Sequence, residues 1–319
     1  MKSMSSWLLL LSVSFSASAV ESDQAQSWLK RLSDSLNSLN FNTSFVVVKN
    51  NQAEPYHWFH GITEDNTEVE ILSLLNGPRK DVLRKGNTVS YIEPEMPPYS
   101  VNASHISSPI PAIFSQDVSK LVENYEFISV GRSRVLGKPA QLVRIVSRDT
   151  HRFGHWVWLD METGLPLKLA LLTRQGQLLE QIQFTHLEIT EAPAESLLQL
   201  ADAELPQVLD LPDNEAQEFA WKVNWLPSGF KQVKSNRHRI AHTKQPVEFM
   251  LFNDGLVDVS VYVNASAEKQ RPVEYVMNGA TVVLNQVTNG FEVSVVGKIP
   301  STTAKAIADS VAFKAAGAP

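Results

Sequence analysis

Hydrophobic residues along the chain recur first at helical spacing and then in short alternating runs. Leucines follow one another at three- and four-residue steps from Leu29 to Leu39, and this spacing predicts an amphipathic helix over residues 22–39. From residue 41 onward the apolar runs become short, with Gly, Asn, Asp or Pro between them. Such runs predict β-strands joined by turns.

Most of the predicted strands fall in one long group before residue 190. They are residues 41–49, 55–63, 68–75, 80–84, 88–92, 125–130, 140–148, 153–159, 167–172 and 178–187. A proline-rich irregular loop over 94–111 and a short helix over 118–124 interrupt the group. Regular short strands with turn residues between them favour an antiparallel sheet, so this part of the chain is predicted to be a β-rich domain.

The composition changes near residue 191, where prolines and acidic residues become frequent. We interpret residues 191–217 as a linker with a short helix at 196–203, because exposed polar segments of this kind join domains. A second group follows, with strands predicted at 247–252, 257–263, 281–284 and 291–296 and a helix at 302–310. The sequence therefore predicts an α+β fold, mostly antiparallel β, with a larger domain at 20–190 and a smaller α+β domain at 218–319.

Residues 1–19 carry the features of a signal peptide in the right order. Lys2 is followed by an apolar run over 7–15 and by the small residues Ala17-Ser18-Ala19, which predicts cleavage after Ala19 and export of the mature chain. An apolar first helix of the domain is the alternative. The run is too short to span a bilayer, which takes about 20 apolar residues, so the mature protein is not expected to span a membrane.

Composition then narrows the chemistry. The chain has no cysteine, which excludes disulfides, thiol nucleophiles and cysteine-ligated zinc. Once Lys2 is removed, 27 basic side chains stand against 34 acidic ones. That balance argues against non-specific binding to nucleic acid, which depends on neutralising phosphates.

Motifs for catalysis or metal binding do not stand out. The sequence holds no Gly-x-Ser-x-Gly elbow, no phosphate-binding glycine loop and no dinucleotide fingerprint. Histidines pair at short spacing as His57/His60, His151/His155 and His238/His242. All three pairs fall in predicted strands or loops, and residues three apart on a strand point to opposite faces. We therefore expect no metal, no cofactor and no enzymatic activity.

Short motifs spread over nearly the whole mature chain resemble one known family. They are Gly77-Pro78-Arg79-Lys80-Asp81-Val82, Arg84-Lys85-Gly86-Asn87, Tyr91-Ile92-Glu93-Pro94, Phe127-Ile128-Ser129-Val130-Gly131-Arg132, Val143-Arg144-Ile145-Val146, Arg148-Asp149, Trp156-Val157-Trp158-Leu159-Asp160, Thr163-Gly164-Leu165-Pro166-Leu167, Trp225-Leu226-Pro227-Ser228-Gly229-Phe230 and Asp254-Gly255-Leu256. Each motif is weak alone, but the ordered set resembles the periplasmic sigma-E regulatory protein family (RseB/MucB).

The resemblance implies a function that composition and spacing do not show. Such proteins are periplasmic negative regulators of the sigma-E envelope stress response. They bind the periplasmic region of a membrane-spanning anti-sigma factor and shield it from proteolysis, and lipid or lipopolysaccharide releases them. The larger domain is expected to resemble the lipoprotein carriers LolA and LolB, with a curved, half-open sheet and helices covering its concave side. The resemblance leaves open whether the protein is a homo-oligomer.

Apolar strand residues are the candidates for binding the lipid. The predicted lipid pocket comprises Phe45, Val47, Tyr91, Trp156, Trp158, Leu169, Leu171 and Phe184. The predicted contacts to anionic head groups are Arg79, Lys80, Arg84, Arg144 and Arg148, because guanidinium groups suit phosphate. The sequence cannot distinguish such a cavity from an ordinary filled core, or these cations from a solvated face.

A basic stretch in the smaller domain is the candidate for binding an acidic partner segment, since complementary charge speeds encounter. The predicted partner-binding residues are Phe230, Lys231, Lys234, Arg237, Arg239 and Phe252. Two other functions stay open at this point. A periplasmic lipid or lipoprotein carrier would share the larger domain, and an envelope hydrolase would need residues brought together from distant segments.

Overall fold

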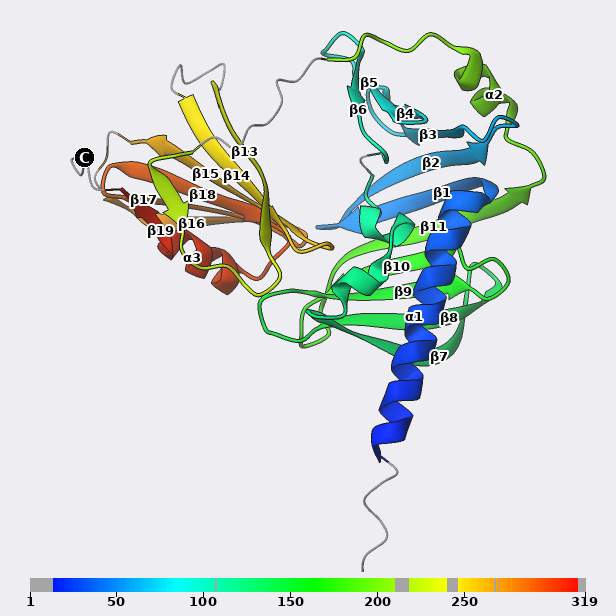
Figure 1. Cartoon of the computed structure of the whole chain (residues 1–319), viewed down its shortest axis with the longest axis horizontal. Coiled ribbons are helices and arrows are strands. Elements are labelled where there is room, and N and C mark those ends of the chain that lie inside the picture. Colours follow the sequence, from blue (N-terminus) through cyan, green and yellow to red (C-terminus); the bar gives the residue numbers. More distant parts are fainter. Residues whose placement is uncertain are drawn as a thin grey trace, which may run out of the picture.

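The computed structural model describes residues 14–106, 108–209, 218–239, 246–266, 268 and 270–314 (Figure 1). Residues 1–13 of the predicted signal peptide and residues 210–217 of the predicted linker lie outside the described residues. The described chain forms a larger and a smaller β-rich domain side by side (Figure 1). Within this described part, no helix combines the length and the apolar composition needed to cross a membrane.

The larger domain is built on one eleven-stranded antiparallel sheet. Its strands are β1 (Asn40–Lys49), β2 (Gln52–Ile62), β3 (Glu68–Leu74), β4 (Lys80–Lys85), β5 (Thr88–Ile92), β6 (Tyr99–Asn102), β7 (Tyr125–Val135), β8 (Lys138–Ser147), β9 (Gly154–Asp160), β10 (Pro166–Leu172) and β11 (Leu178–Thr190). They lie in the order β6-β5-β4-β3-β2-β1-β11-β10-β9-β8-β7, so β6 and β7 are the two edges and the curved sheet stays open. The predicted mostly antiparallel, half-open sheet is confirmed.

Strand β1 illustrates how the sequence selects the face of the sheet that becomes the core. Phe41, Thr43, Phe45 and Val47 are buried, and the residues that alternate with them are partly accessible. Because successive side chains on a strand point to opposite faces, this alternation places one apolar row on the concave side. Val143, Ile145 and Val157 extend the same core across β8 and β9.

Helix α1 (Ser14–Ser38) covers the concave side together with two short 3-10 helices, η1 (Ala112–Ser115) and η2 (Val118–Leu121) (Figure 1). Leu29, Leu32 and Leu36 are buried in the core beneath it, as their helical spacing predicts. The helix starts at Ser14 and not near residue 22, so the predicted starting point is wrong. The helical run of the domain continues directly into the end of the predicted signal peptide.

Two further segments differ from the sequence-based expectation. The loop predicted over 94–111 contains strand β6, whose four residues include no proline. Helix α2 (Glu195–Asp202) packs on β2, β3 and β4, so the first part of the predicted linker lies against the larger sheet. Gly61 permits this contact, because a Cβ atom there would lie 2.9 Å from the Leu197 side chain. The hydroxyl of Ser100 on β6 donates to the carbonyl of Pro206 at 2.7 Å and ties down the following residues.

The smaller domain is a six-stranded antiparallel sheet covered on one face. Its strands, in spatial order, are β13 (Lys231–Arg239), β14 (Pro246–Asn253), β15 (Asp258–Ala265), β18 (Phe291–Gly297), β17 (Thr281–Thr288) and β16 (Gln270–Asn278). Helix α3 (Ser301–Asp309) and the two-stranded sheet of β12 (Trp221–Val223) and β19 (Val311–Phe313) complete the domain. Strands β13 and β16 were not predicted, because polar and charged residues interrupt their apolar pattern.

The two domains meet around a buried ion pair. Arg152, in the loop between β8 and β9, donates from Nε to Asp254 Oδ2 at 2.5 Å, and both side chains are fully buried. The Tyr125 hydroxyl donates to the same carboxylate oxygen at 2.7 Å. Asp254 Oδ1 also accepts from the backbone N–H groups of Leu256 and Val257, at 2.9 and 2.8 Å. One aspartate of the smaller domain therefore holds two side chains of the larger domain and its own turn.

Other contacts surround this pair. The Arg152 guanidinium lies over the rings of Tyr125 and Phe230, 5.5 and 4.9 Å from their centroids, and donates to the carbonyl of Ser228. Burial, and then the Asp254 charge, raise the pKa of the Tyr125 hydroxyl, so it stays a proton donor at neutral pH. Arg152 also pairs with Asp149 of the larger domain, so its guanidinium is held by one carboxylate from each domain.

We predict that Asp254→Ala lowers the free energy of unfolding by about 1–3 kcal/mol, because Arg152 Nε and the Tyr125 hydroxyl lose their shared buried acceptor while Asp149 still pairs with Arg152. Urea denaturation measures this loss, and small-angle X-ray scattering is expected to show a wider spread of domain orientations. The matched control is Asp258→Ala, four residues further along the chain, at the start of β15. It removes an exposed carboxylate and is expected to change stability by less than about 0.5 kcal/mol. Equal effects of the two substitutions would contradict the role given to Asp254.

Candidate functional site

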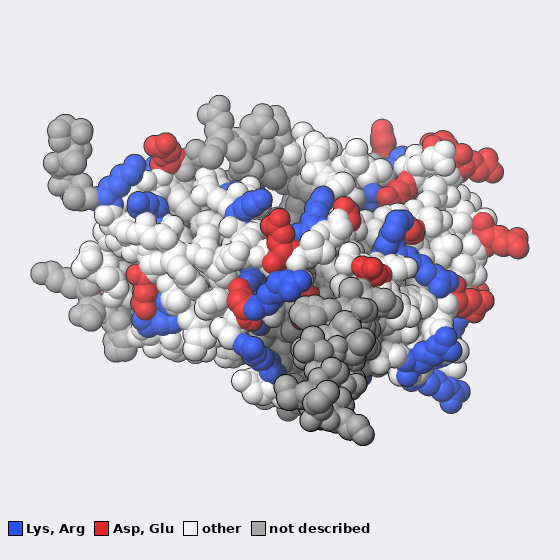
Figure 2. All heavy atoms as spheres, turned by 60° about the horizontal axis from the view of Figure 1, so that its bottom comes forward, with Lys and Arg blue, Asp and Glu red and all other residues white. Residues whose placement is uncertain are grey.

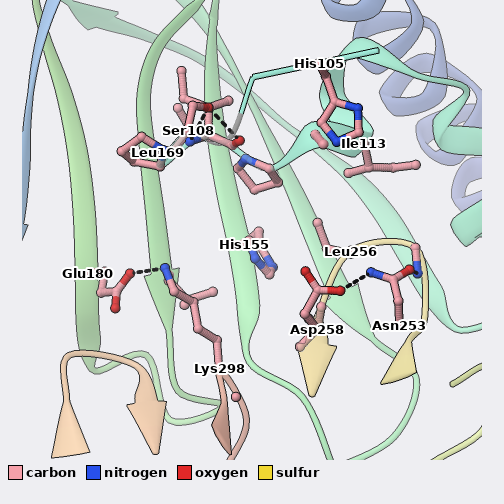
Figure 3. Close-up of a pocket in the computed structure, with 18 of the residues that line it drawn as sticks. His105, Ser108, Ile113, His155, Leu169, Glu180, Asn253, Leu256, Asp258 and Lys298 are labelled. Carbon is pink, nitrogen blue, oxygen red and sulfur yellow. Dashed lines mark hydrogen bonds and ion pairs between the residues drawn. The ribbon is translucent and has the colours of Figure 1, made fainter. Parts of the chain in front are cut away.

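A cavity of about 1040 Å³ lies where the two domains meet (Figure 3). The concave face of β9, β10 and β11 forms one wall, the segment 103–116 forms a second, and the near ends of β14, β15 and β18 form the third. This volume is at the upper end of the range of about 300–1,000 Å³ that ligand pockets occupy. The cavity therefore has room for a sizeable ligand.

One side of the cavity is apolar. Leu169 and Leu171 on β10, 6% and 7% exposed, share a face with Ile182 on β11. Ile106 and Ile113 approach from the segment that crosses in front of the sheet. Each methylene of an acyl chain buried against such a wall would contribute about 0.8 kcal/mol to binding.

Toward the smaller domain, the cavity is bordered by a few polar groups (Figure 3). Glu180 on β11 accepts from Lys298 Nζ at 2.6 Å and from the backbone N–H of Ala280 at 3.0 Å, so this ion pair also joins the two domains. Asn253 donates to Asp258 at 2.7 Å on the smaller domain. An apolar pocket with a few placed polar groups is typical of ligand sites.

His155 on β9 lies at the centre of the cavity (Figure 3). Its Nδ1 atom is buried and has no hydrogen-bond partner among the described residues. Desolvation by burial, and then the nearby Lys298 charge, lower the pKa of this imidazole to about 4. At neutral pH the ring is therefore uncharged.

A second polar cluster lies on the concave face, beneath the segment that crosses the sheet. Ligand atoms of His60, Glu68 and Glu70 lie within 4.8 Å of one another, a spacing that would suit a metal ion. Arg84 already pairs with two of these three residues, donating to Glu68 at 2.5 Å and to Glu70 at 2.6 Å. Burial opposes ionisation of Glu68, but hydrogen bonds from His60 and Arg84 hold the pKa of its carboxyl below the usual value. The cluster is satisfied by the protein itself.

The residues predicted to form the lipid pocket divide into three groups. Phe45, Val47 and Phe184 are in the filled core. Tyr91, Leu169 and Leu171 line the cavity. Trp156 borders it through β9, but the rings of Trp156 and Trp158 belong to the outer face of the sheet, opposite Val157. Alternation places the two tryptophans together, yet the sequence could not show which face of β9 is concave.

The predicted head-group cations do not form one rim. Arg84 is buried and paired, as described above, and is unavailable to a ligand in this conformation. Arg79 is exposed and pairs with Asp81 at 2.5 Å, beside the exposed Lys80. Arg144 lies on the outer face, and Arg148 Nε donates to the carbonyl of Val122 at 3.2 Å. Figure 2 shows charges of both signs interspersed over one face of the molecule.

The predicted partner-binding residues also separate. Phe230 and Phe252 are in the core of the smaller domain, 8% and 4% exposed. Lys231, Lys234 and Arg237 lie on β13, and Arg237 pairs with Glu248 of the neighbouring strand. The Arg239 side chain lies outside the described residues, as do those of His238 and His242.

Sequence reasoning missed the residues that join the domains. Arg152, Asp254, Glu180 and Lys298 come from segments far apart in the chain, and no spacing rule connects them. One hint was present in the sequence: three of the family motifs, Arg148-Asp149, residues 225–230 and residues 254–256, contain or adjoin the residues that meet where the domains join. Gly229 of one such motif has a φ of +86°, and a Cβ atom there would lie 2.0 Å from the Asn124 amide. Close approach of the two domains therefore requires glycine at this position.

Comparison with known proteins covers both domains. The family model for the MucB/RseB N-terminal domain matches residues 24–209, and the model for the MucB/RseB C-terminal domain matches residues 215–312. The sigma-E factor regulatory protein RseB of Escherichia coli K12 is 33% identical over 306 residues, which cover 96% of each chain. The sigma factor AlgU regulatory protein MucB of Pseudomonas aeruginosa is 34% identical over 315 residues, which cover 98% of each chain.

Solved structures of MucB are also similar to this chain. A crystal structure of MucB in complex with MucA(peri) superposes with a TM-score of 0.73 at 33% identity, covering 92% of this chain and 100% of that one. A crystal structure of MucB without a named partner gives a TM-score of 0.58 at 29% identity, covering 92% of this chain and 99% of that one. By TM-score, this chain is therefore more similar to the MucB structure with MucA(peri) than to the MucB structure without a named partner.

We predict that acid destabilises the protein partly through His155. Its folded pKa of about 4 lies below the unfolded value of about 6.5, so the unfolded chain takes up the proton first. The contribution of neutral His155 to the free energy of unfolding is therefore complete above pH 6.5. It is lost as the pH falls toward 4, by up to about 3 kcal/mol. Urea denaturation of the wild type and of His155→Gln across this range measures it.

The His155→Gln variant is expected to lose less stability on acidification than the wild type. The control is His105→Gln, because His105 also borders the cavity but is exposed. The same pH profile for wild type and His155→Gln would show that this imidazole is not a buried neutral group.

Proposed function

Because this chain belongs to the MucB/RseB family, we propose that it is a negative regulator of the sigma-E envelope stress response. It binds the periplasmic region of a membrane-spanning anti-sigma factor and shields that region from proteolysis. The observation that carries the proposal is the match of both domains, in order, to relatives named as sigma factor regulators, one of them solved in complex with MucA(peri). We place the protein in the periplasm, exported by the signal peptide at residues 1–19.

The partner surface we favour is the free edge of β13. Within the described residues, β13 pairs only with β14, so one side of its backbone has no neighbouring strand. Unpaired N–H and C=O groups on an edge strand accept an additional extended segment. Lys231 and Arg237 are exposed on it, and Val233 is 57% exposed. These side chains suit an extended, acidic segment of the partner polypeptide.

The opposite edge of the same sheet provides a comparison. Strand β16 also pairs on one side only, but its exposed residues among the described side chains are Glu274, Tyr275, Val276, Met277 and Asn278, none of which is a cation. An acidic partner would gain no electrostatic steering there, whereas complementary charge on β13 raises the association rate. The charge difference between the two edges is therefore the reason for choosing β13.

We predict that Lys231→Glu/Lys234→Glu weakens binding of the anti-sigma periplasmic segment at least about tenfold, mostly through slower association. Surface plasmon resonance at low and high salt measures the rates. Arg132→Glu/Arg134→Glu is the control, since it makes the same charge change on exposed residues of β7, an edge strand of the larger sheet. Loss of binding in the control and not in the β13 variant would exclude β13 as the docking edge.

The cavity between the domains suits the effector that releases the partner. Its apolar wall and the few polar groups beside that wall fit an amphipathic lipid or a lipopolysaccharide fragment with buried acyl chains. Residues of both domains line the cavity, and Val233 of β13 is among them. A ligand held there would thus act on the proposed partner surface. Coupling of this kind is reciprocal, so the partner must weaken effector binding by the same factor.

We predict that Leu169→Trp places a larger side chain in the cavity and prevents the effector from weakening partner binding. Without effector, the variant is expected to bind the partner with wild-type affinity. Titration of the partner segment by calorimetry, with and without a short-chain lipopolysaccharide, measures both quantities. Wild-type affinity that stays constant at every effector concentration would defeat the proposed release mechanism.

A lipid or lipoprotein carrier is the second candidate, favoured by the size of the cavity. A carrier treats lipid as cargo, so it should co-purify with lipid and without a stable protein partner. Under either proposal the protein holds other molecules and makes or breaks no bond. An envelope extract passed over the immobilised protein, followed by mass spectrometry of bound proteins and lipids, distinguishes regulator from carrier.

A further inference from the structure

The outer face of the larger sheet carries a strip of residues that the function above does not use. Two adjacent rows run across its strands, as the pairing register defines them. One row is Ile128, Arg144, Trp156, Ala170, Gln181, Val48 and Ala53, and the other is Gly131, Leu142, Trp158, Lys168, Gln183, Val46 and Pro55. Directly paired residues point to the same side of a sheet, so these rows form one continuous surface.

This surface is open to solvent. Trp156, Trp158, Arg144 and Lys168 are all partly accessible, and Val48 is 38% exposed. Helix α1 packs on the concave side, where its leucines join the core, and α2 packs on β2, β3 and β4. Neither helix therefore covers the strip over β8, β9 and β10.

Two cations and two indole rings form the centre of the strip. The Arg144 guanidinium lies over the Trp156 ring, 5.1 Å from its centroid, and Lys168 Nζ lies 4.8 Å from the centroid of Trp158. The two tryptophan rings are themselves 6.0 Å apart. Arg144 Nε is buried and has no hydrogen-bond partner among the described residues. Stacking holds both cations in place without neutralising their charge.

The charge of the strip contrasts with that of the whole chain. The chain has a formal net charge of −6, yet neither row contains an aspartate or a glutamate. The two central cations therefore face outward from a strip that is otherwise aromatic, aliphatic or amide. Tryptophan is enriched where protein meets the lipid head-group layer, and cations are attracted to anionic lipid surfaces.

We propose that this outer-face strip docks on the surface of an anionic phospholipid bilayer. The tryptophan rings would lie at the head-group level, and Arg144 and Lys168 would contact lipid phosphates. The inference deepens the proposed function, since a regulator of a membrane-spanning partner works beside a bilayer. This surface contact is separate from lipid uptake into the cavity, which opens on the opposite face of the sheet.

Vesicle co-sedimentation of the mature protein tests the proposal, with no partner present. Vesicles of phosphatidylcholine alone are compared with vesicles that also contain phosphatidylglycerol. We expect binding to the anionic vesicles only, and its loss at high salt, because screening weakens exposed charge interactions. Arg144→Gln/Lys168→Gln should lower the partition coefficient about 30-fold, whereas the control Lys222→Gln/Lys314→Gln, which removes two exposed cations of the smaller domain, should not.

The outcomes separate this proposal from the proposed function. Equal binding to neutral and anionic vesicles, no binding to either, or equal loss in both double variants would overturn bilayer docking. If Arg144→Gln/Lys168→Gln instead weakens binding of the anti-sigma segment, the strip is a protein-docking surface and the proposal fails. Circular dichroism of each variant establishes that folding is unchanged, and partner affinity measured in parallel reports on the regulator function independently.

Discussion

The buried pair between Arg152 and Asp254 is the contact on which the arrangement of the two domains depends. Each side chain is inaccessible to water, and each is satisfied only by groups of both domains acting together. Removing two charges from water is costly, so the pair stabilises the protein only in the geometry that supplies every hydrogen bond. That requirement selects one orientation of the smaller domain over neighbouring ones.

The cavity follows from this constraint. Neither sheet encloses it alone, because its walls are the concave face of β9 to β11, a crossing segment and the ends of three strands of the smaller domain. The ion pair of Glu180 and Lys298 closes part of the same border. A ligand that changed the spacing of these walls would act on the domain junction directly. Under the proposed function, partner binding and effector binding would be linked through domain orientation.

The sequence predicted the parts of the fold that alternate regularly. The rows of β1 and β10, with Phe45, Val47, Leu169 and Leu171, follow from a period of two in the apolar pattern. Strand β13 escaped prediction because its residues are mostly polar and charged, and only pairing with β14 makes it a strand. The faces of β9 could not be assigned, since both are largely apolar. Arg152 could not be found because Asp254 lies 102 residues away.

Hydrogen exchange with and without the anti-sigma periplasmic segment tests the central claim most directly, that this protein holds a partner polypeptide on a rigid pair of domains. We predict slow exchange at the turn after Asp254 in both states and new protection of the β13 amides on binding, because an added strand would occupy its free edge. Fast exchange at that turn, or a bound partner that leaves β13 unprotected, would contradict the account.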